Sequence, residues 1–463
     1  MALLTARTKN ARPAGGPGAD GPGRDSGLLQ PAEPRLRGRW PVLAAVELVV
    51  LLAVLATAVF VAGRLDAWAD KGLDFSVYWY GGKILNDAGP APSGLYQPTV
   101  NWAGGPELPF TYPPFAALLF SLLAKLPQAT ALLLFNTAGV AVAGWVAALG
   151  VRYWNSKPGW RSTFASPTFR SALNRLGAVV LFLAVLNLGP WRETLAFGQI
   201  NILLLGLMTA DLLSGSPRWR NGVPGSGFLV GVAAGIKLTP LVFGLYFLVR
   251  KDWRGLLNMS AGFALTVLLG WVLRPAESLS FWLEILPDTS RIGGAGYVDN
   301  LSIKGALLHF GVPADVVNVP WMLLSLLVVG LGAAVIRTAS SQGARVVAIS
   351  ATALTMLLVS PVSWSHHWVW MAAVLPAFAW TLRETPQRHR LSRWGMGAVL
   401  GVSTVVFLFS PKTIGTALGA ENLDLQTPVP WIMASSAGVF CALAILVCWL
   451  LVLRRDAVAE LAG

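Results

Sequence analysis

One carboxylic acid in this chain lies among aromatic side chains, where it could act as a base. Asp74 is part of the stretch LDFSVYWYGG, residues 73–82, whereas Asp66, Asp70 and Asp87 have more polar neighbours. Loss of water around a carboxyl group raises its pKa and makes the anion a better proton acceptor near neutral pH. Asp74 is therefore a candidate general base. A helix N-cap or a structural acid is the alternative interpretation of the same pattern.

Lys237 is a candidate ligand for a phosphate group. It stands in the segment GIKLTP, residues 235–240, between two apolar half-runs. A cation inside a membrane protein usually faces an anion or a water-filled cavity, and an ammonium group pairs well with phosphate. The alternative is that its long side chain only extends to the membrane interface.

Two neighbouring histidines, His366 and His367, lie next to tryptophans in the segment SPVSWSHHWVW, residues 360–370. Because adjacent residues on a helix do not face the same way, we do not expect both to bind one metal ion. One imidazole that points into a cavity could instead donate to a phosphate. The pattern does not indicate which of the two does so.

A short polar turn between two apolar segments holds Arg192, Glu193, Gln199 and Asn201. Polar groups at such a depth line a cavity, find partners or cap helix ends. The glycine-containing segment 291–300 follows no strand, so it is not a nucleotide-binding fingerprint.

No motif for a metal or cofactor occurs in the sequence. It has no HExxH, Walker, GxSxG or DxD pattern. The two cysteines, Cys441 and Cys448, lie within one apolar segment and form no CxxC site. The sequence therefore predicts neither a metal nor a cofactor.

The composition indicates a polytopic membrane protein. Of 463 residues, 55% are hydrophobic and only 12% are charged, whereas soluble domains carry about 25% charged residues. The mean hydropathy is +0.60. The net charge of +13 is explained by Lys and Arg in loops at a membrane face. Nucleic acid is therefore not an expected partner.

The apolar runs of the sequence indicate where helices are expected, and we expect no strands. The clear runs are 42–63, 129–150, 173–189, 200–213, 255–273, 320–337, 346–359, 366–380, 394–410 and 430–453. Residues 115–126 form a helix of only about 18 Å, too short for a bilayer core of about 30 Å, and are expected at the interface. Residues 227–249 are expected to break at Lys237 into two helices.

These assignments give twelve crossings with both termini inside. The cytoplasmic segments then hold 25 of the 35 Lys and Arg residues, in agreement with the positive-inside rule. We expect a disordered cytoplasmic tail (1–41), a transmembrane domain (42–453) and a cytoplasmic C-terminal tail (454–463). The first outer loop with its interfacial helices covers 64–128, and chemistry is expected on the outer face.

Six stretches, in this order, resemble the GT-C superfamily of integral membrane glycosyltransferases, above all the actinobacterial polyprenol-phosphate-mannose-dependent α-(1→2)-mannosyltransferases. They are LDFSVYWYGGKILNDAGPAPSGLY, FTYPPFAALLF, FGQINILLLGLMTADLL, GVAAGIKLTPLVFGLYFLVRKDWR, NLSIKGALLHF and SPVSWSHHWVW, and they cover roughly residues 70–380. The chain departs from that family at Asn300-Leu301-Ser302, where the family typically has Asn-Gln-Ser, and in the tail before residue 42.

The resemblance implies an enzyme of the plasma membrane that acts on the extracytoplasmic side. It would transfer mannose from a polyprenyl-phosphate-linked donor to a glycolipid or lipoglycan with inversion. Asp74 matches the family's catalytic acid, and His366 or His367 matches its late histidine. The expected donor- and substrate-binding residues are Lys237, His366, His367, Arg192, Gln199, Asn201, Tyr112, Arg291 and Asn300.

The residues by themselves agree with a lipid donor. A lipid phosphate is its own leaving group, so the protein need supply only a base and positive charge. Inversion needs one carboxylate on the attacking side. Two alternatives stay open: an arabinofuranosyltransferase that uses a polyprenyl-phosphate donor, and a flippase or transporter for lipid-linked sugars. A transporter would be expected to contain an internal sequence repeat, and we find none.

Overall fold

The computed structural model describes residues 72–88, 94–96, 108–155, 167–213, 226–288, 293–385, 390–410, 414 and 429–462. Regular elements in these ranges are helices, without a strand, and one isolated β-bridge joins Asn300 to Trp364. The expected all-helical class is confirmed. The predicted tail 1–41, the first crossing 42–63 and Arg291 lie outside the described residues.

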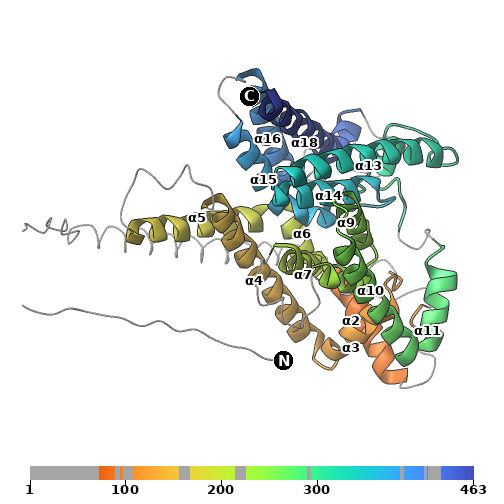
Figure 1. The fold of residues 1–463 in the computed structure, drawn as a ribbon. Helices are drawn as coiled ribbons and strands as arrows, with labels where there is room; N and C mark the ends of the chain where they lie inside the picture. Colours follow the sequence, from red (N-terminus) through yellow and green to blue (C-terminus); the bar gives the residue numbers. More distant parts are fainter. Residues whose placement is uncertain are drawn as a thin grey trace, which may run out of the picture. The chain divides into compact units, whose positions relative to one another are not determined.

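The helices keep the labels of Figure 1. Their bounds are α2 (Leu73–Ala88), α3 (Pro114–Leu123), α4 (Gln128–Asn155), α5 (Pro167–Asn187), α6 (Gly189–Phe197), α7 (Asn201–Leu213), α8 (Phe228–Ile236), η3 (Thr239–Phe243), α9 (Gly244–Val249), α10 (Trp253–Leu273), α11 (Pro275–Ser280), η4 (Phe281–Ile285), α12 (Ile303–His309), α13 (Asn318–Ser341), α14 (Arg345–Val359), η6 (Ser365–Trp370), α15 (Met371–Glu384), α16 (Arg390–Phe409) and α18 (Val429–Ala462).

Five helices in the described ranges are long and apolar enough to cross a membrane: α4, α10, α13, α16 and α18. The pair α5 and α6, bent by 66°, could be a sixth crossing or a re-entrant loop. The chain is therefore a multi-pass membrane protein. Helices α7 and α14, at the expected crossings 200–213 and 346–359, reach only about 20 to 23 Å, so the count of twelve stays a prediction.

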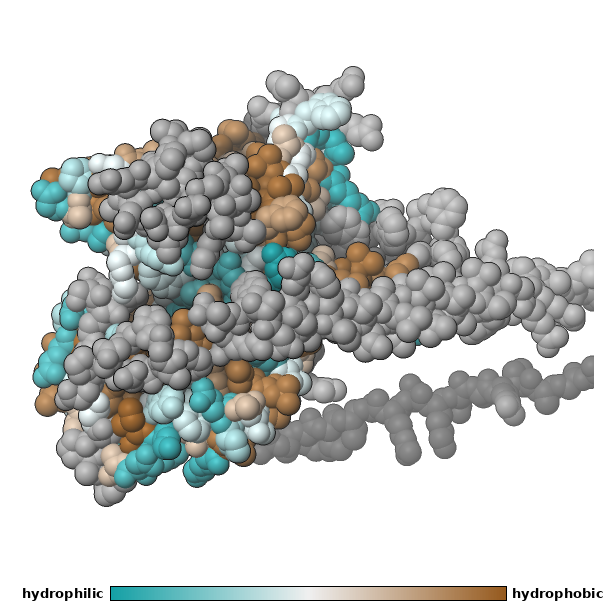
Figure 2. Space-filling view, turned by 180° about the vertical axis from the view of Figure 1, so that it is seen from behind, coloured by the Kyte–Doolittle hydropathy of each residue, from teal (hydrophilic) through white to brown (hydrophobic). Residues whose placement is uncertain are grey.

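The long helices α10 and α13 carry the apolar surface that a bilayer would cover. Leu268 and Val272 on α10 and Leu326 and Leu327 on α13 are each more than half exposed. Figure 2 shows apolar side chains on the parts of the rear face that grey atoms leave visible. Helix α14, by contrast, packs against α13 and α15 and is almost entirely buried.

The chain breaks at Lys237, as the sequence predicts. Helix α8 ends at Ile236, Lys237 is extended, and η3 begins at Thr239-Pro240 before α9 continues. Proline lacks an N–H and cannot continue the hydrogen bonds of α8. The N–H of Lys237 still donates to the carbonyl oxygen of Ala233 at 3.0 Å, whereas its φ of −146° and ψ of 126° take the chain out of the helix.

Helices α8 and α10 pack closely because each has a glycine that faces the backbone of the other. A Cβ on Gly231 would lie 2.0 Å from the carbonyl oxygen of Met259, and one on Gly262 would lie 2.2 Å from that of Phe228. Small residues spaced four apart allow membrane helices such close approach. This contact fixes the end of α8 and therefore the position of Lys237.

Gly231→Ala should lower the stability of the folded protein, because the methyl group must push α8 away from α10. Overpacking of this kind costs about 1–3 kcal/mol. Gly330→Ala is the matched control, since a Cβ at Gly330 on α13 meets nothing within 4 Å. Thermal unfolding of both variants in detergent measures the difference, and equal midpoints would contradict the close α8–α10 contact.

Candidate active site

Asp74 is placed next to the turn between α6 and α7 by the start of α2. The N–H of Gly72 donates to the carbonyl oxygen of Ala196 at 2.7 Å, which ties the two segments together. Gly198 ends α6 with φ of +65°, and a Cβ there would lie 2.6 Å from the Cβ of Phe75. Only glycine combines this conformation with so close an approach.

The surroundings of Asp74 suit a general base. Its side chain is partly exposed. Removal of water by the protein is the largest effect and raises the pKa of Asp74 to about 6, although a hydrogen bond from Gln199 and the charge of Lys237 oppose the rise. The carboxyl group is therefore mostly ionised at pH 7 and still has a high proton affinity.

Lys237 lies in a polar cluster with Asn201 and His367. Its Nζ donates to Oδ1 of Asn201 at 2.9 Å and lies 3.1 Å from Nε2 of His367. It also lies 5.8 Å from the centre of the Tyr112 ring. Burial and the charge of Lys237 hold the pKa of His367 well below its usual range, so the imidazole is neutral and its Nε2 accepts from the ammonium group.

Gln199 and two tyrosines form a second hydrogen-bonded cluster beside Asp74. The Tyr78 hydroxyl donates to Oε1 of Gln199 at 2.8 Å and lies 3.0 Å from the Tyr112 hydroxyl. Tyr78 and Gln199 are buried, whereas Tyr112 is partly exposed. Tyr78 lies four residues after Asp74, on the same helix face, and this spacing could have identified it from the sequence.

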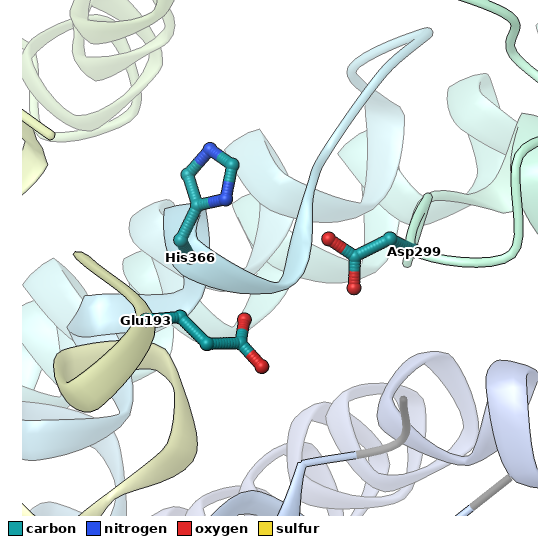
Figure 3. A group of neighbouring side chains, drawn as sticks. All are labelled: Glu193, Asp299 and His366. Atoms are coloured by element: carbon teal, nitrogen blue, oxygen red, sulfur yellow. The ribbon is translucent and has the colours of Figure 1, made fainter. Parts of the chain in front are cut away.

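His366 lies beside two acids. The ligand atoms of His366, Glu193 and Asp299 all lie within 4.8 Å of one another, and all three residues are buried (Figure 3). Carboxylates and imidazole are ligand types for divalent metals, so this group could hold one. The three residues lie far apart in the chain, and no motif spacing could have revealed the group.

The backbone of η6 is tied to α6 and α7 at His366. Its carbonyl oxygen accepts from Oγ1 of Thr194 at 2.9 Å and from Nδ2 of Asn201 at 3.1 Å. The Ser365 hydroxyl donates to the Glu193 carboxylate. These bonds place the His367 ring, and not the His366 ring, beside Lys237.

Arg192 and Asn300 contact the backbone in this structure. The guanidinium of Arg192 donates to the carbonyl oxygens of Asn187 and, at 2.8 Å, Leu408. The roles predicted for both residues in substrate binding stay predictions.

The buried Asn300 side chain forms three hydrogen bonds. It donates to the carbonyls of Ala295 at 2.8 Å and Pro361 at 3.1 Å and accepts from the N–H of Ser363 at 2.8 Å. These bonds join the segment before α12 to the segment before η6.

A small pocket lies next to the Lys237 cluster. Asn201, His367, Ser360 and Ser363 contribute polar groups to its wall. The apolar part of the wall is formed by Leu204, Met208, Pro240, Met356, Leu357, Val369 and Trp370. Lys237 contacts two of the lining residues, Asn201 and His367, so the pocket combines polar groups near a cation with apolar side chains, as an amphipathic anion requires.

The fold and the site together define a class, a multi-pass membrane protein with a carboxylate and a cation near the turn between two of its helices. The chain belongs to glycosyltransferase family 87, whose sequence profile matches residues 110–361. The expectation of a membrane-bound glycosyltransferase is confirmed.

Curated relatives match most of the chain. It is 35% identical to a polyprenol-phosphate-mannose-dependent alpha-(1-2)-phosphatidylinositol mannoside mannosyltransferase of Mycolicibacterium smegmatis, over 74% of this chain and 77% of the relative. The protein of that description from Mycobacterium tuberculosis is 36% identical, over 69% and 72%. A phosphatidylinositol pentamannoside mannosyltransferase of M. smegmatis is 30% identical, over 82% and 86%. No solved structure gives a significant match.

Asn300→Leu should destabilise the protein, because its three partners lose their hydrogen bonds inside the fold. A buried group left without a partner costs about 1–3 kcal/mol. The exposed Asn318 on α13 provides the control Asn318→Leu. A variant at Asn300 that unfolds at the control's temperature but binds substrate less well would show that Asn300 acts on substrate.

Proposed function

We propose that the protein transfers mannose from a polyprenyl-phosphate-mannose donor to a phosphatidylinositol-mannoside type of glycolipid and forms an α-(1→2) linkage. The names of the relatives support the donor, the linkage and the acceptor class. The observation that carries the proposal is that the start of α2, which holds Asp74, and Lys237 both contact the region where α6 meets α7, through Ala196 and Asn201. Asp74 and Lys237 supply the base and the cation that such a transfer needs.

In the proposed reaction an acceptor hydroxyl attacks the anomeric carbon of the donor mannose. The bond from that carbon to the phosphate oxygen breaks, and the electron pair leaves with the lipid phosphate. Asp74 accepts the hydroxyl proton, and Lys237 stabilises the charge on the departing phosphate. Attack opposite the leaving group inverts the anomeric centre, so a single carboxylate is sufficient.

The cavity beside His367 supports the binding of a lipid-linked donor. The phosphate would lie at its polar end, within reach of Lys237 and His367. The first isoprenoid units would contact the apolar wall around Met208 and Met356. Asn201 holds the ammonium group of Lys237 in place, so it is proposed to act through that lysine.

We further propose that the site faces the outer side of the plasma membrane, in a chain of twelve crossings. The support is the concentration of 25 of 35 Lys and Arg residues in the segments assigned to the cytoplasm. The donor would then reach the site from within the outer leaflet. The interfacial helix α3, with the exposed Leu122, would lie beside it.

Asp74→Asn should lower turnover by about 10²–10⁴-fold, because the amide cannot accept the proton. Asp87→Asn is the control. Asp87 is an exposed carboxylate on the same helix, so this variant should keep the wild-type turnover. Radiolabelled mannosyl transfer by purified protein measures both. Since Asp74 must be ionised and its pKa is about 6, wild-type turnover should fall as the pH drops through 6. Near-normal transfer by Asp74→Asn would refute the assignment.

Lys237→Met should weaken donor binding, because a charge-assisted bond to phosphate is lost. Titration of a fluorescent polyprenyl-phosphate-mannose analogue measures this, and Lys83→Met, which removes an exposed lysine from α2, should bind the donor as the wild type does. Unchanged affinity in Lys237→Met would leave this lysine with no role in donor binding.

Sidedness can be tested by cysteine labelling in a background of Cys441→Ala and Cys448→Ala. Asn86→Cys, at an exposed position on α2, should react with an impermeant maleimide in intact cells. Ser341→Cys, at the exposed end of α13, should react only after the membrane is disrupted. The reverse pattern would place the site on the inner face.

A further inference from the structure

We propose that Gln199 and Tyr78 are positioning residues that orient the Asp74 carboxylate, and that Gln199 does not bind substrate. The inference rests on the proposed role of Asp74 as the base. It assigns a role to Tyr78, which the sequence did not single out. It also replaces the expected contact between Gln199 and substrate with a contact to the base.

The orientation of the Gln199 amide is determined by Tyr78. The Tyr78 hydroxyl donates to Oε1 of Gln199 at 2.8 Å, so the amide NH₂ group must face the other way. There it donates to the carboxylate of Asp74 and contacts the Tyr112 hydroxyl. A flipped amide would direct its oxygen at the carboxylate and repel it.

Tyr78 is held in place by aromatic contacts. Its ring is fully buried, stacks on Phe120 with centres 4.4 Å apart, and contacts the edge of Tyr112 at 5.0 Å. Its hydroxyl lies 3.0 Å from that of Tyr112, which can donate to it. The direction of each hydrogen bond is therefore set by a rigid ring.

Gln199 is fixed at its backbone as well. Its N–H donates to the carbonyl oxygen of Thr194 at 2.8 Å, and Gly198 before it has the left-handed conformation that ends α6. The side chain is buried, whereas that of Asp74 is partly exposed. Substrate can thus reach the carboxylate from the exposed side, while the amide holds it from behind.

The amide also keeps Asp74 in its ionised form. A donor to a carboxylate stabilises the anion, and the hydrogen bond from Gln199 lowers the pKa of Asp74 against the effect of burial. Lys237 does the same by its charge. Without the amide bond the base would be protonated at a higher pH, and less of it would be active at neutral pH.

The other titratable groups that face Asp74 do not titrate near pH 6. They are Tyr78 on its own helix, Tyr112 before α3, and Lys237 after α8, with His367 beside the lysine. Burial raises the pKa of both tyrosines and lowers that of His367. The acidic limb of the pH profile therefore reports on Asp74.

The test compares Tyr78→Phe and Gln199→Met with the wild type and with Tyr80→Phe, a tyrosine on the same helix that contacts Trp79. The pH dependence of kcat and the KM values for donor and acceptor are measured for each. Relative to the wild type at the same pH, both variants should lose about tenfold in kcat at pH 6.5 and recover part of it at pH 8. Burial lowers the pKa of Lys237 to about 8, and its titration affects all of these proteins alike. Their KM values should stay close to those of the wild type, and Tyr80→Phe should behave as the wild type throughout.

Three outcomes would overturn the inference. A loss of kcat that is equal at every pH would indicate damage to the fold. A raised KM with an unmoved acidic limb would make Gln199 a substrate ligand. An additional loss when Tyr78→Phe is combined with Asp74→Asn would show that Tyr78 acts independently of the base. Failure of the proposed function itself has a different signature, because Asp74→Asn would then remain active.

Discussion

The site depends on an attraction between opposite charges that are held where little water reaches them. The Asp74 carboxylate and the Lys237 ammonium group act on one another across the space between α2 and the break after α8. Such an attraction is stronger inside a protein than in water. Both side chains are nevertheless partly exposed, so the charges that stabilise each other in the resting protein are also within reach of a substrate.

Lys237 lies at the break between α8 and η3, and neighbouring side chains form hydrogen bonds with its ammonium group. Asn201 and the neutral His367 accept hydrogen bonds from the ammonium group, which replaces the water that it loses. Asn201 also donates to the carbonyl oxygen of His366. One amide thus orients the cation and at the same time anchors the turn that supplies its histidine partner.

The adjacent residues His366 and His367 have different neighbours, and the backbone hydrogen bonds of η6 hold both in place. Thr194 and Asn201 hold the carbonyl of His366, and the two imidazole rings lie edge to face with centres 4.8 Å apart. His367 faces the lysine, whereas His366 faces Glu193 and Asp299. Two neighbouring residues therefore contact one basic group and one acidic group, and the two imidazole rings join these surroundings.

The features that depend on local composition can be predicted from the amino-acid sequence. Hydropathy indicates the all-helical membrane class, and the Lys and Pro between apolar half-runs predict the break at Lys237. The aromatic surroundings of Asp74 make it a candidate base. Tertiary structure alone decided which histidine lies beside Lys237, that Tyr78 orients Gln199, and that Glu193, Asp299 and His366 converge. The physical reason is that burial and helix breaks arise from neighbours in the chain, whereas these contacts join residues from separate helices, and their geometry exists only once the helices have packed.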